Sequence, residues 1–181
     1  MVDFTAFGLK KDQKGLTFIE LLIAMPIAVI IGAAIVMSLA QVFSTNTRSQ
    51  NHLVAVKQVE VAMHYINRDA EMSYPSKITP RTGAATAFPL TLEWYDLTNV
   101  HHRVVYSLVT TNGLTSLQRT ETIGSASPVT TNIARYIDAN SANSFYSFDG
   151  TTLVVQITAT VGGSQSVSET RTLNVVPRTT Q

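Results

Sequence analysis

Residues 21–40, LLIAMPIAVIIGAAIVMSLA, form an apolar run without a charged side chain, and this run decides the fold. A helix needs about 20 apolar residues to cross about 30 Å of hydrocarbon, because it rises about 1.5 Å per residue. The run therefore predicts a membrane-spanning helix. Extending it back to Leu16 admits one charge, that of Glu20.

Basic residues precede this run at Lys10, Lys11 and Lys14. A basic flank stays in the cytoplasm, which places the C-terminus of a single-pass protein outside. A cleaved secretory signal has a shorter apolar stretch of about 7–15 residues, followed by small residues at the cleavage site. No such site follows Ala40. We expect the span to be kept, either after trimming upstream of it or as an uncleaved signal anchor.

The composition excludes several classes of function. Charged residues make up 14% of the 181 residues, against about 25% in typical domains. The 13 basic and 12 acidic side chains give a net charge of +1, so no nucleic-acid-binding surface is indicated. Because cysteine is absent, disulfides, thiolate metal sites and cysteine nucleophiles are excluded.

Residues 14–22, KGLTFIELL, carry a family resemblance. The stretch resembles the prepilin motif of the type IV pilin and type II secretion pseudopilin superfamily, usually G-F-T-L-I-E-L, although Leu16 stands where phenylalanine is usual. The resemblance implies that a prepilin peptidase cuts after Gly15 and methylates the new amine on Leu16. It also implies a precursor in the inner (cytoplasmic) membrane, an assembly platform there, and a mature subunit in an extracellular or periplasmic filament.

Glu20 lies where a charge is costly, about 2.5–3.5 kcal/mol at the centre of a membrane helix. Cleavage after Gly15 would create an amine on Leu16, about 6 Å from Glu20 along a helix axis. That amine can pair with Glu20 of its own helix or with Glu20 of a neighbouring subunit. An acid in a first helical turn is also favourable by about 0.3–1 kcal/mol. The resemblance implies the second pairing, which recruits and aligns subunits during assembly.

The apolar run continues into an amphipathic segment. No Gly or Pro interrupts residues 41–74, and Pro75 supplies a stop. We expect one helix over residues 17–73, bent or locally unwound at Pro26, which lacks a backbone donor. Its first half can be covered only by lipid or by identical helices. The apolar stripe expected to face the rest of the chain is Leu53, Val56, Val59, Met63, Ile66 and Ala70.

The C-terminal part is typical of β-structure. Alternating apolar and polar residues, with Asn112-Gly113 and Asp149-Gly150 between such runs, predict hairpins. The secondary structure of residues 132–137 is ambiguous from the sequence. We expect an α+β pilin-like fold, in which the long helix packs on an antiparallel sheet of about five strands. The expected segments are a cleaved leader (1–15), a transmembrane and filament-core helix (16–43), its amphipathic continuation (44–74) and an exported β-sheet domain (75–181).

Chemistry-bearing side chains do not form a recognisable constellation in the sequence. The adjacent His101 and His102 should point to opposite faces of a strand, and His52 and His64 lie too far apart on a helix to share a ligand. We expect no catalytic residue, no metal, no cofactor and no enzyme activity.

The expected function is that of a structural filament subunit, with other pilin subunits, the prepilin peptidase, the assembly platform and the lipid bilayer as partners. Residues 66–70 (INRDA) and 175–178 (VVPR) look similar to minor pilins of the W type and to J-type pseudopilins. A minor pilin is therefore expected. The alternatives are a major subunit, a pseudopilin of a type II secretion system, or a filament-tip adhesin.

Overall fold

The computed structural model describes residues 17–178 except residue 82. It confirms the α+β class, because one long helix contacts two antiparallel sheets. The chain divides into two compact units, Met1–Phe43 and Ser44–Gln181. Both sheets belong to the second unit.

Helix α1, Phe18–Met72, has 55 residues and is continuous through Pro26. The expected helix over residues 17–73 is therefore confirmed, whereas a bend at Pro26 stays a prediction. The helix ends where Ser73 donates its backbone N–H to the carbonyls of Asp69 and Ala70. A short 3-10 helix, η1 (Pro75–Lys77), follows, since Pro75 cannot continue the α-helical hydrogen bonds.

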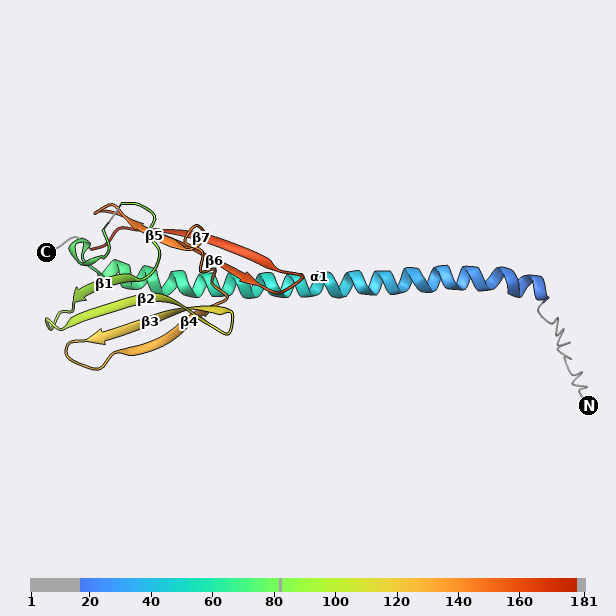
Figure 1. The fold of residues 1–181 in the computed structure, drawn as a ribbon, viewed down its shortest axis with the longest axis horizontal. Coiled ribbons are helices and arrows are strands. Elements are labelled where there is room, and N and C mark those ends of the chain that lie inside the picture. The colour runs from blue at the N-terminus through green and yellow to red at the C-terminus, as the bar shows by residue number, and fades with distance from the viewer. Residues whose placement is uncertain (1–16, 82, 179–181) are drawn as a thin grey trace, which may run out of the picture. The chain divides into compact units, whose positions relative to one another are not determined.

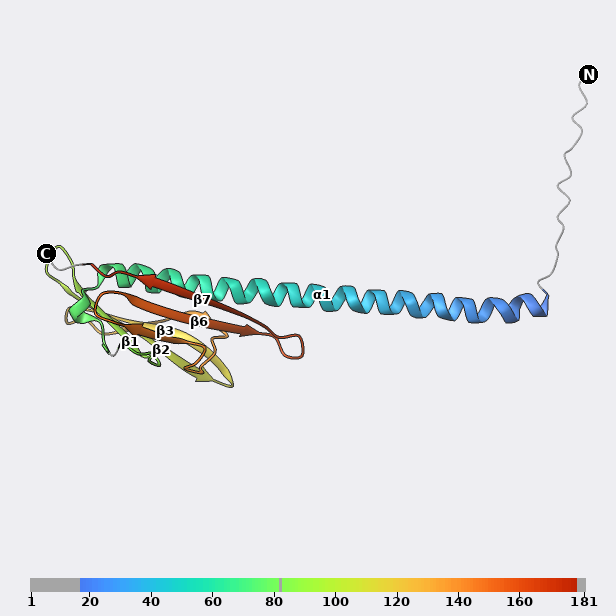
Figure 2. The same ribbon diagram turned by 90° about the horizontal axis from the view of Figure 1, so that it is seen from above.

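Seven strands form two sheets, both of which run beside the second half of α1 (Figure 1 and Figure 2). The first sheet has the order β1-β2-β3-β4 and the second has the order β5-β6-β7. Neighbouring strands are always consecutive in the chain, so local hairpins build both sheets. The strands are β1 (Leu90–Tyr95), β2 (His101–Thr111), β3 (Leu114–Ile123), β4 (Val129–Arg135), β5 (Phe145–Phe148), β6 (Leu153–Val161) and β7 (Val167–Val175).

The hairpins predicted from the turn residues are confirmed. Asn112 and Gly113 join β2 to β3 with φ values of 52° and 77°, which is the left-handed pair that a two-residue hairpin turn needs. Asp149 accepts the amides of Thr151 and Thr152 in the connection from β5 to β6.

The single sheet of about five strands has to be corrected to two sheets with seven strands in all. Strand β4 begins at Val129, in a Ser/Thr/Pro-rich stretch, and extends into residues 132–137, which were ambiguous in the sequence. Its first four residues are exposed on both faces, so no alternation marks it. After β4 the chain crosses between the sheets, since the Ile137 amide bonds Thr115 and the Asp138 amide bonds Thr158.

The core of the second unit joins a column of alanine, valine and isoleucine residues on α1 to aliphatic and aromatic residues on the strands. Ala55, Val59, Ala62, Ile66 and Ala70 are fully buried. Full burial of each larger aliphatic or aromatic side chain contributes roughly 1.5–3 kcal/mol. The largest buried partners on the strands are Leu90, Leu92, Val104, Tyr106, Leu117, Tyr146, Phe148, Leu153 and Ile157.

The helix face in the core differs from the expected stripe at several positions. Leu53 is 66% exposed, whereas Ala55, Ala62 and Asp69 are buried. Three of the buried positions on this face are alanines, whose small side chains allow the helix backbone to pack closely on the strands.

Candidate functional site

Glu20 lies in the first turn of α1, where it is bonded to the residue that precedes the helix. Thr17 donates both its backbone N–H and its hydroxyl to Glu20 Oε2, each at 2.8 Å. This arrangement satisfies one of the free amides at the start of the helix. Among the described residues nothing bonds Oε1 of Glu20, so this oxygen can accept a further donor. Gly15 and Leu16, the predicted processing site, lie outside the described residues.

The first half of α1 is apolar and uncovered. It is the one described helix that is long and apolar enough to cross a membrane, and none of its most apolar window is buried. A cleavable signal sequence passes the same test of length and composition. A Cβ on Gly32 would meet no atom within 4 Å, so packing within the chain does not require this glycine. The large apolar side chains exposed here include Phe18, Ile19, Leu22, Ile23, Met25, Ile30, Ile31, Ile35, Val36, Met37, Leu39 and Phe43.

A buried ionic cluster joins the end of α1 to the first sheet. The fully buried Asp69 accepts the Tyr106 hydroxyl and the Arg119 Nε on Oδ2, both at 2.6 Å. Its Oδ1 accepts Nε and Nη2 of Arg68 at 3.1 and 2.9 Å. Burial, and then the charge of Asp69, raise the pKa of Tyr106 far above 10. Tyr106 therefore stays a neutral donor, and the cluster fixes the helix to β2 and β3.

The cluster continues along β3 toward His102. Arg119 donates Nη1 to Glu121 at 2.8 Å, and this bond lowers the pKa of Glu121 despite partial burial. Burial opposes the charge of Arg119, but its bonds to Glu121 and Asp69 outweigh burial and raise the pKa of the guanidinium. His102 Nδ1 is buried without a hydrogen-bond partner among the described residues, 3.7 Å from Glu121 Oε1. The His102 ring instead stacks on Trp94, with centroids 5.2 Å apart.

His101 and His102 point to opposite faces of β2, as their adjacency predicts. His101 lies 3.2 Å from Glu93, while His102 faces Asp96 and Glu121. Over residues 17–178, leaving out residue 82, no group of three or more His, Cys, Asp or Glu side chains is arranged so that it could hold a metal ion. His52 lies against Glu169, and His64 packs edge-on against Tyr65.

Asp96 organises the turn between β1 and β2. Its Oδ1 accepts the amides of Val100 and Thr98 and the Thr98 hydroxyl, at 2.7–2.9 Å. The Val100 amide, followed by the Thr98 hydroxyl, lowers the pKa of Asp96 from 3.8 to about 2. The ionised carboxylate therefore holds this turn most firmly.

Acid should loosen this turn at an unusually low pH. Because the folded pKa of Asp96 is depressed, its stabilising contribution is present above the unfolded value of 3.8 and is lost as the pH falls through about 2. Amide NMR shifts of Thr98 and Val100 should titrate with a midpoint near pH 2. A midpoint near pH 3.8 would show that these bonds do not favour the ionised form.

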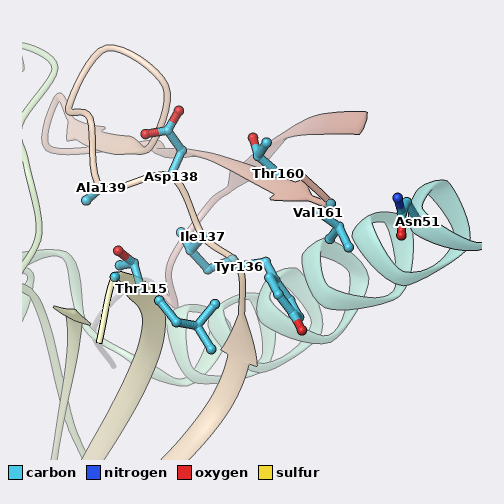
Figure 3. Close-up of a pocket in the computed structure, with 11 residues that line it drawn as sticks. Asn51, Thr115, Tyr136, Ile137, Asp138, Ala139, Thr160 and Val161 are labelled. Atoms are coloured by element: carbon cyan, nitrogen blue, oxygen red, sulfur yellow. The ribbon is translucent and has the colours of Figure 1, made fainter. Parts of the chain in front are cut away.

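A hollow of about 690 Å³ opens at the end of the second unit where Asn51 lies (Figure 3). Figure 3 shows the segment from Tyr136 to Ala139 crossing it between the two sheets. The Tyr136 carbonyl accepts the Thr160 amide, and Tyr136 itself has a left-handed φ of 63°. The apolar part of the lining is Leu114, Tyr136, Ile137, Ala139 and Val161, and the polar part includes Asn51, Thr115, Asp138 and Thr160.

Asp69 was noted in the sequence only as part of residues 66–70 (INRDA), so its role in a buried ionic cluster was not predicted. A signal was present, because Asp69 follows Ile66 by three positions and so continues the buried face of the helix. Arg119 likewise follows Leu117 by two positions on the inner face of β3. An acid and a base that both interrupt apolar patterns are candidates for a buried pair.

Comparison with protein-family models, with curated proteins and with solved structures gave no match to this chain. The architecture of the chain is therefore the main guide to its function. A long N-terminal apolar helix that packs on antiparallel sheets is consistent with a pilin-like fold. The uncovered apolar half of α1 fits insertion into a membrane or a secretion signal.

Proposed function

We propose that the protein is a structural subunit of a type IV pilus-like filament. It is inserted in the inner membrane as a single-pass precursor, trimmed by a prepilin peptidase, and assembled through packing of its N-terminal helices. The observation that carries this proposal is that the first half of α1 exposes large apolar side chains all around its surface. A surface of this kind needs lipid before assembly and identical helices afterwards.

Glu20 supplies the register for that packing. Its Oε2 is already bonded to Thr17, which leaves Oε1 for the amine of a neighbouring subunit. A carboxylate in an apolar surrounding gains most from a charged partner. Each incoming subunit is thereby set at one axial step relative to the preceding one.

The proposal is tested by the intact mass of the protein from sheared filaments. The expected mass lacks residues 1–15 and includes one methyl group on Leu16. A protein that keeps these residues and is found only in the membrane fraction would refute the proposed processing and assembly together.

Glu20→Ala should leave membrane insertion and cleavage intact but strongly lower incorporation into filaments, because the incoming amine loses its partner. The measurement compares the sheared fraction with the membrane fraction by immunoblot. Glu60→Ala, which removes an exposed acid from the second half of the same helix, is the matched control and should incorporate normally. Equal incorporation of both variants would reject the role of Glu20.

The abundance of the subunit is tested by immunogold labelling of sheared filaments. A minor pilin, as the W-type and J-type similarities suggest, gives sparse labelling. A major subunit gives continuous labelling, and a tip adhesin labels one end. A pseudopilin is distinguished by a secretion defect on deletion.

A further inference from the structure

A second hollow, the Trp94 hollow, has a volume of about 450 Å³. Residues of the β1–β2 turn and of the segments near the end of α1 form its walls. Its volume lies within the range of about 300–1,000 Å³ typical of pockets that enclose a small molecule. Aromatic and planar polar side chains share the lining, which includes Tyr74, Trp94, Asp96, Leu97, Asn99 and Arg178.

Trp94 gives the hollow a rigid aromatic wall with an unused donor. Its indole ring stacks on His102 with the centroids 5.2 Å apart, and the residue is only 6% exposed. The indole N–H donates to none of the described residues. His102 Nδ1 is the one enclosed side-chain atom without a partner in the described part of the chain, so the Trp94 N–H is not enclosed and opens on the hollow. A buried tryptophan usually finds an acceptor for this group, which here a ligand can supply.

Three further polar side chains around the Trp94 hollow are free to bind. The Tyr74 hydroxyl, the Asn99 amide and the Arg178 guanidinium bond none of the described residues. The backbone at Asn99 is ordered, since its φ of 60° is left-handed and its N–H donates to the Asp96 carbonyl. The Arg178 N–H donates in the same way to Ser73. Side chains on an ordered backbone lose less freedom on binding, which favours affinity.

The charges that line the Trp94 hollow favour a neutral ligand. The Val100 amide, followed by the Thr98 hydroxyl, lowers the pKa of Asp96 to about 2, so Asp96 is an anion at neutral pH. Arg178 is a cation. A charged ligand of either sign would therefore meet a like charge, whereas a neutral molecule with hydroxyl groups can donate to the carboxylate and accept from the guanidinium.

We propose that the Trp94 hollow binds a neutral saccharide. A sugar ring has an apolar C–H face, which packs on the negative face of an aromatic ring. The hydroxyl groups around its rim accept from the Trp94 N–H and from Arg178, and exchange hydrogen bonds with the Asn99 amide. This inference goes beyond the proposed function and does not depend on it, because the lining residues belong to the second unit alone.

The single tryptophan of the chain makes saccharide binding measurable. The full chain, purified in a detergent without a sugar headgroup, is titrated with lactose, cellobiose, maltose and chitobiose, and with glucuronate as a charged comparison. We expect Trp94 fluorescence to change saturably with at least one neutral disaccharide and not with glucuronate. Saturation-transfer NMR of the same mixtures detects binding that leaves the emission unchanged. Absence of both signals for every neutral disaccharide, or binding of glucuronate alone, would overturn the proposal.

Two variants show whether the saccharide binds in the Trp94 hollow. Asn99→Gly removes the amide but keeps the left-handed backbone, which glycine adopts readily, and should raise the half-saturating concentration about fivefold. Arg178→Met removes a charge-assisted donor and should raise it roughly tenfold. Asn112→Gly is the matched control, since it makes the same change in the β2–β3 turn, where φ is 52°, and should bind like the wild type. Equal binding by all three variants would place the saccharide elsewhere and refute the proposed site.

Discussion

Asp69→Ala is expected to lower the free energy of unfolding of the second unit by about 3–5 kcal/mol, the usual cost of removing one partner of a buried ion pair. The substitution leaves Arg119, whose side chain is only 10% exposed, with Glu121 as its remaining partner. It also removes the acceptor of the buried Tyr106 hydroxyl. Urea unfolding of the full chain in detergent, followed by fluorescence of the single tryptophan, Trp94, measures the loss.

Glu71→Ala is the matched control for this prediction. Glu71 is an exposed acid two positions further along α1, where it accepts a hydrogen bond from Asn67. Surface substitutions of this kind usually change stability by at most about 0.5 kcal/mol. If both variants lose the same stability, the cluster around Asp69 is not what fixes the helix to the sheet.

The long helix could be predicted from the sequence because its signals are local. Residues 41–74 lack Gly and Pro, and Pro75 follows at once, so the predicted end at residue 73 is one residue from the observed end at Met72. The Asn112-Gly113 hairpin is local in the same sense, since the turn residues themselves determine the left-handed backbone.

Strand β4 and the division into two sheets could not be predicted, because they depend on contacts between distant segments. Thr130 and Thr131 carry no alternation that would mark a strand, and β4 exists because it pairs with β3. The crossing at Ile137 and Asp138 depends on carbonyls of β3 and β6. Periodicity within one segment does not reveal such partners.

The residues of the candidate site also differ in whether local sequence signals reveal them. Glu20 stands out because a lone charge interrupts an apolar run, and its bond to Thr17 is local. Asp69 stood among other polar residues near the helix end, so only its three-dimensional partners Tyr106 and Arg119 distinguish it. The hollow of Figure 3, which Asn51 and Val161 help to line, likewise brings together residues from the helix, both sheets and a linker.

Gly162→Ala is expected to destabilise the second unit by roughly 2–6 kcal/mol. Gly162 has a φ of 100°, and holding an ordinary residue in such a sparsely populated backbone region costs about 1–3 kcal/mol. The added Cβ would also lie 2.5 Å from Asn51 Nδ2 and 2.9 Å from the Gln165 carbonyl, and overpacking adds a further 1–3 kcal/mol or so. Urea unfolding measured by Trp94 fluorescence gives the difference from the wild type.

Gly163→Ala is the control, because it shows whether replacing any glycine in this turn lowers the stability or only one with a strained backbone does. A Cβ on Gly163 would meet nothing within 4 Å, and its φ lies outside the left-handed region. Gly163→Ala should therefore unfold within about 0.5 kcal/mol of the wild type or slightly later, because alanine restricts the unfolded chain. Since Asn51 Nδ2 donates to Gln165 at 3.0 Å, only Gly162→Ala should break the link between α1 and the turn before β7. Equal stabilities of the two alanine variants would show that this turn adjusts to the added Cβ without a loss of stability.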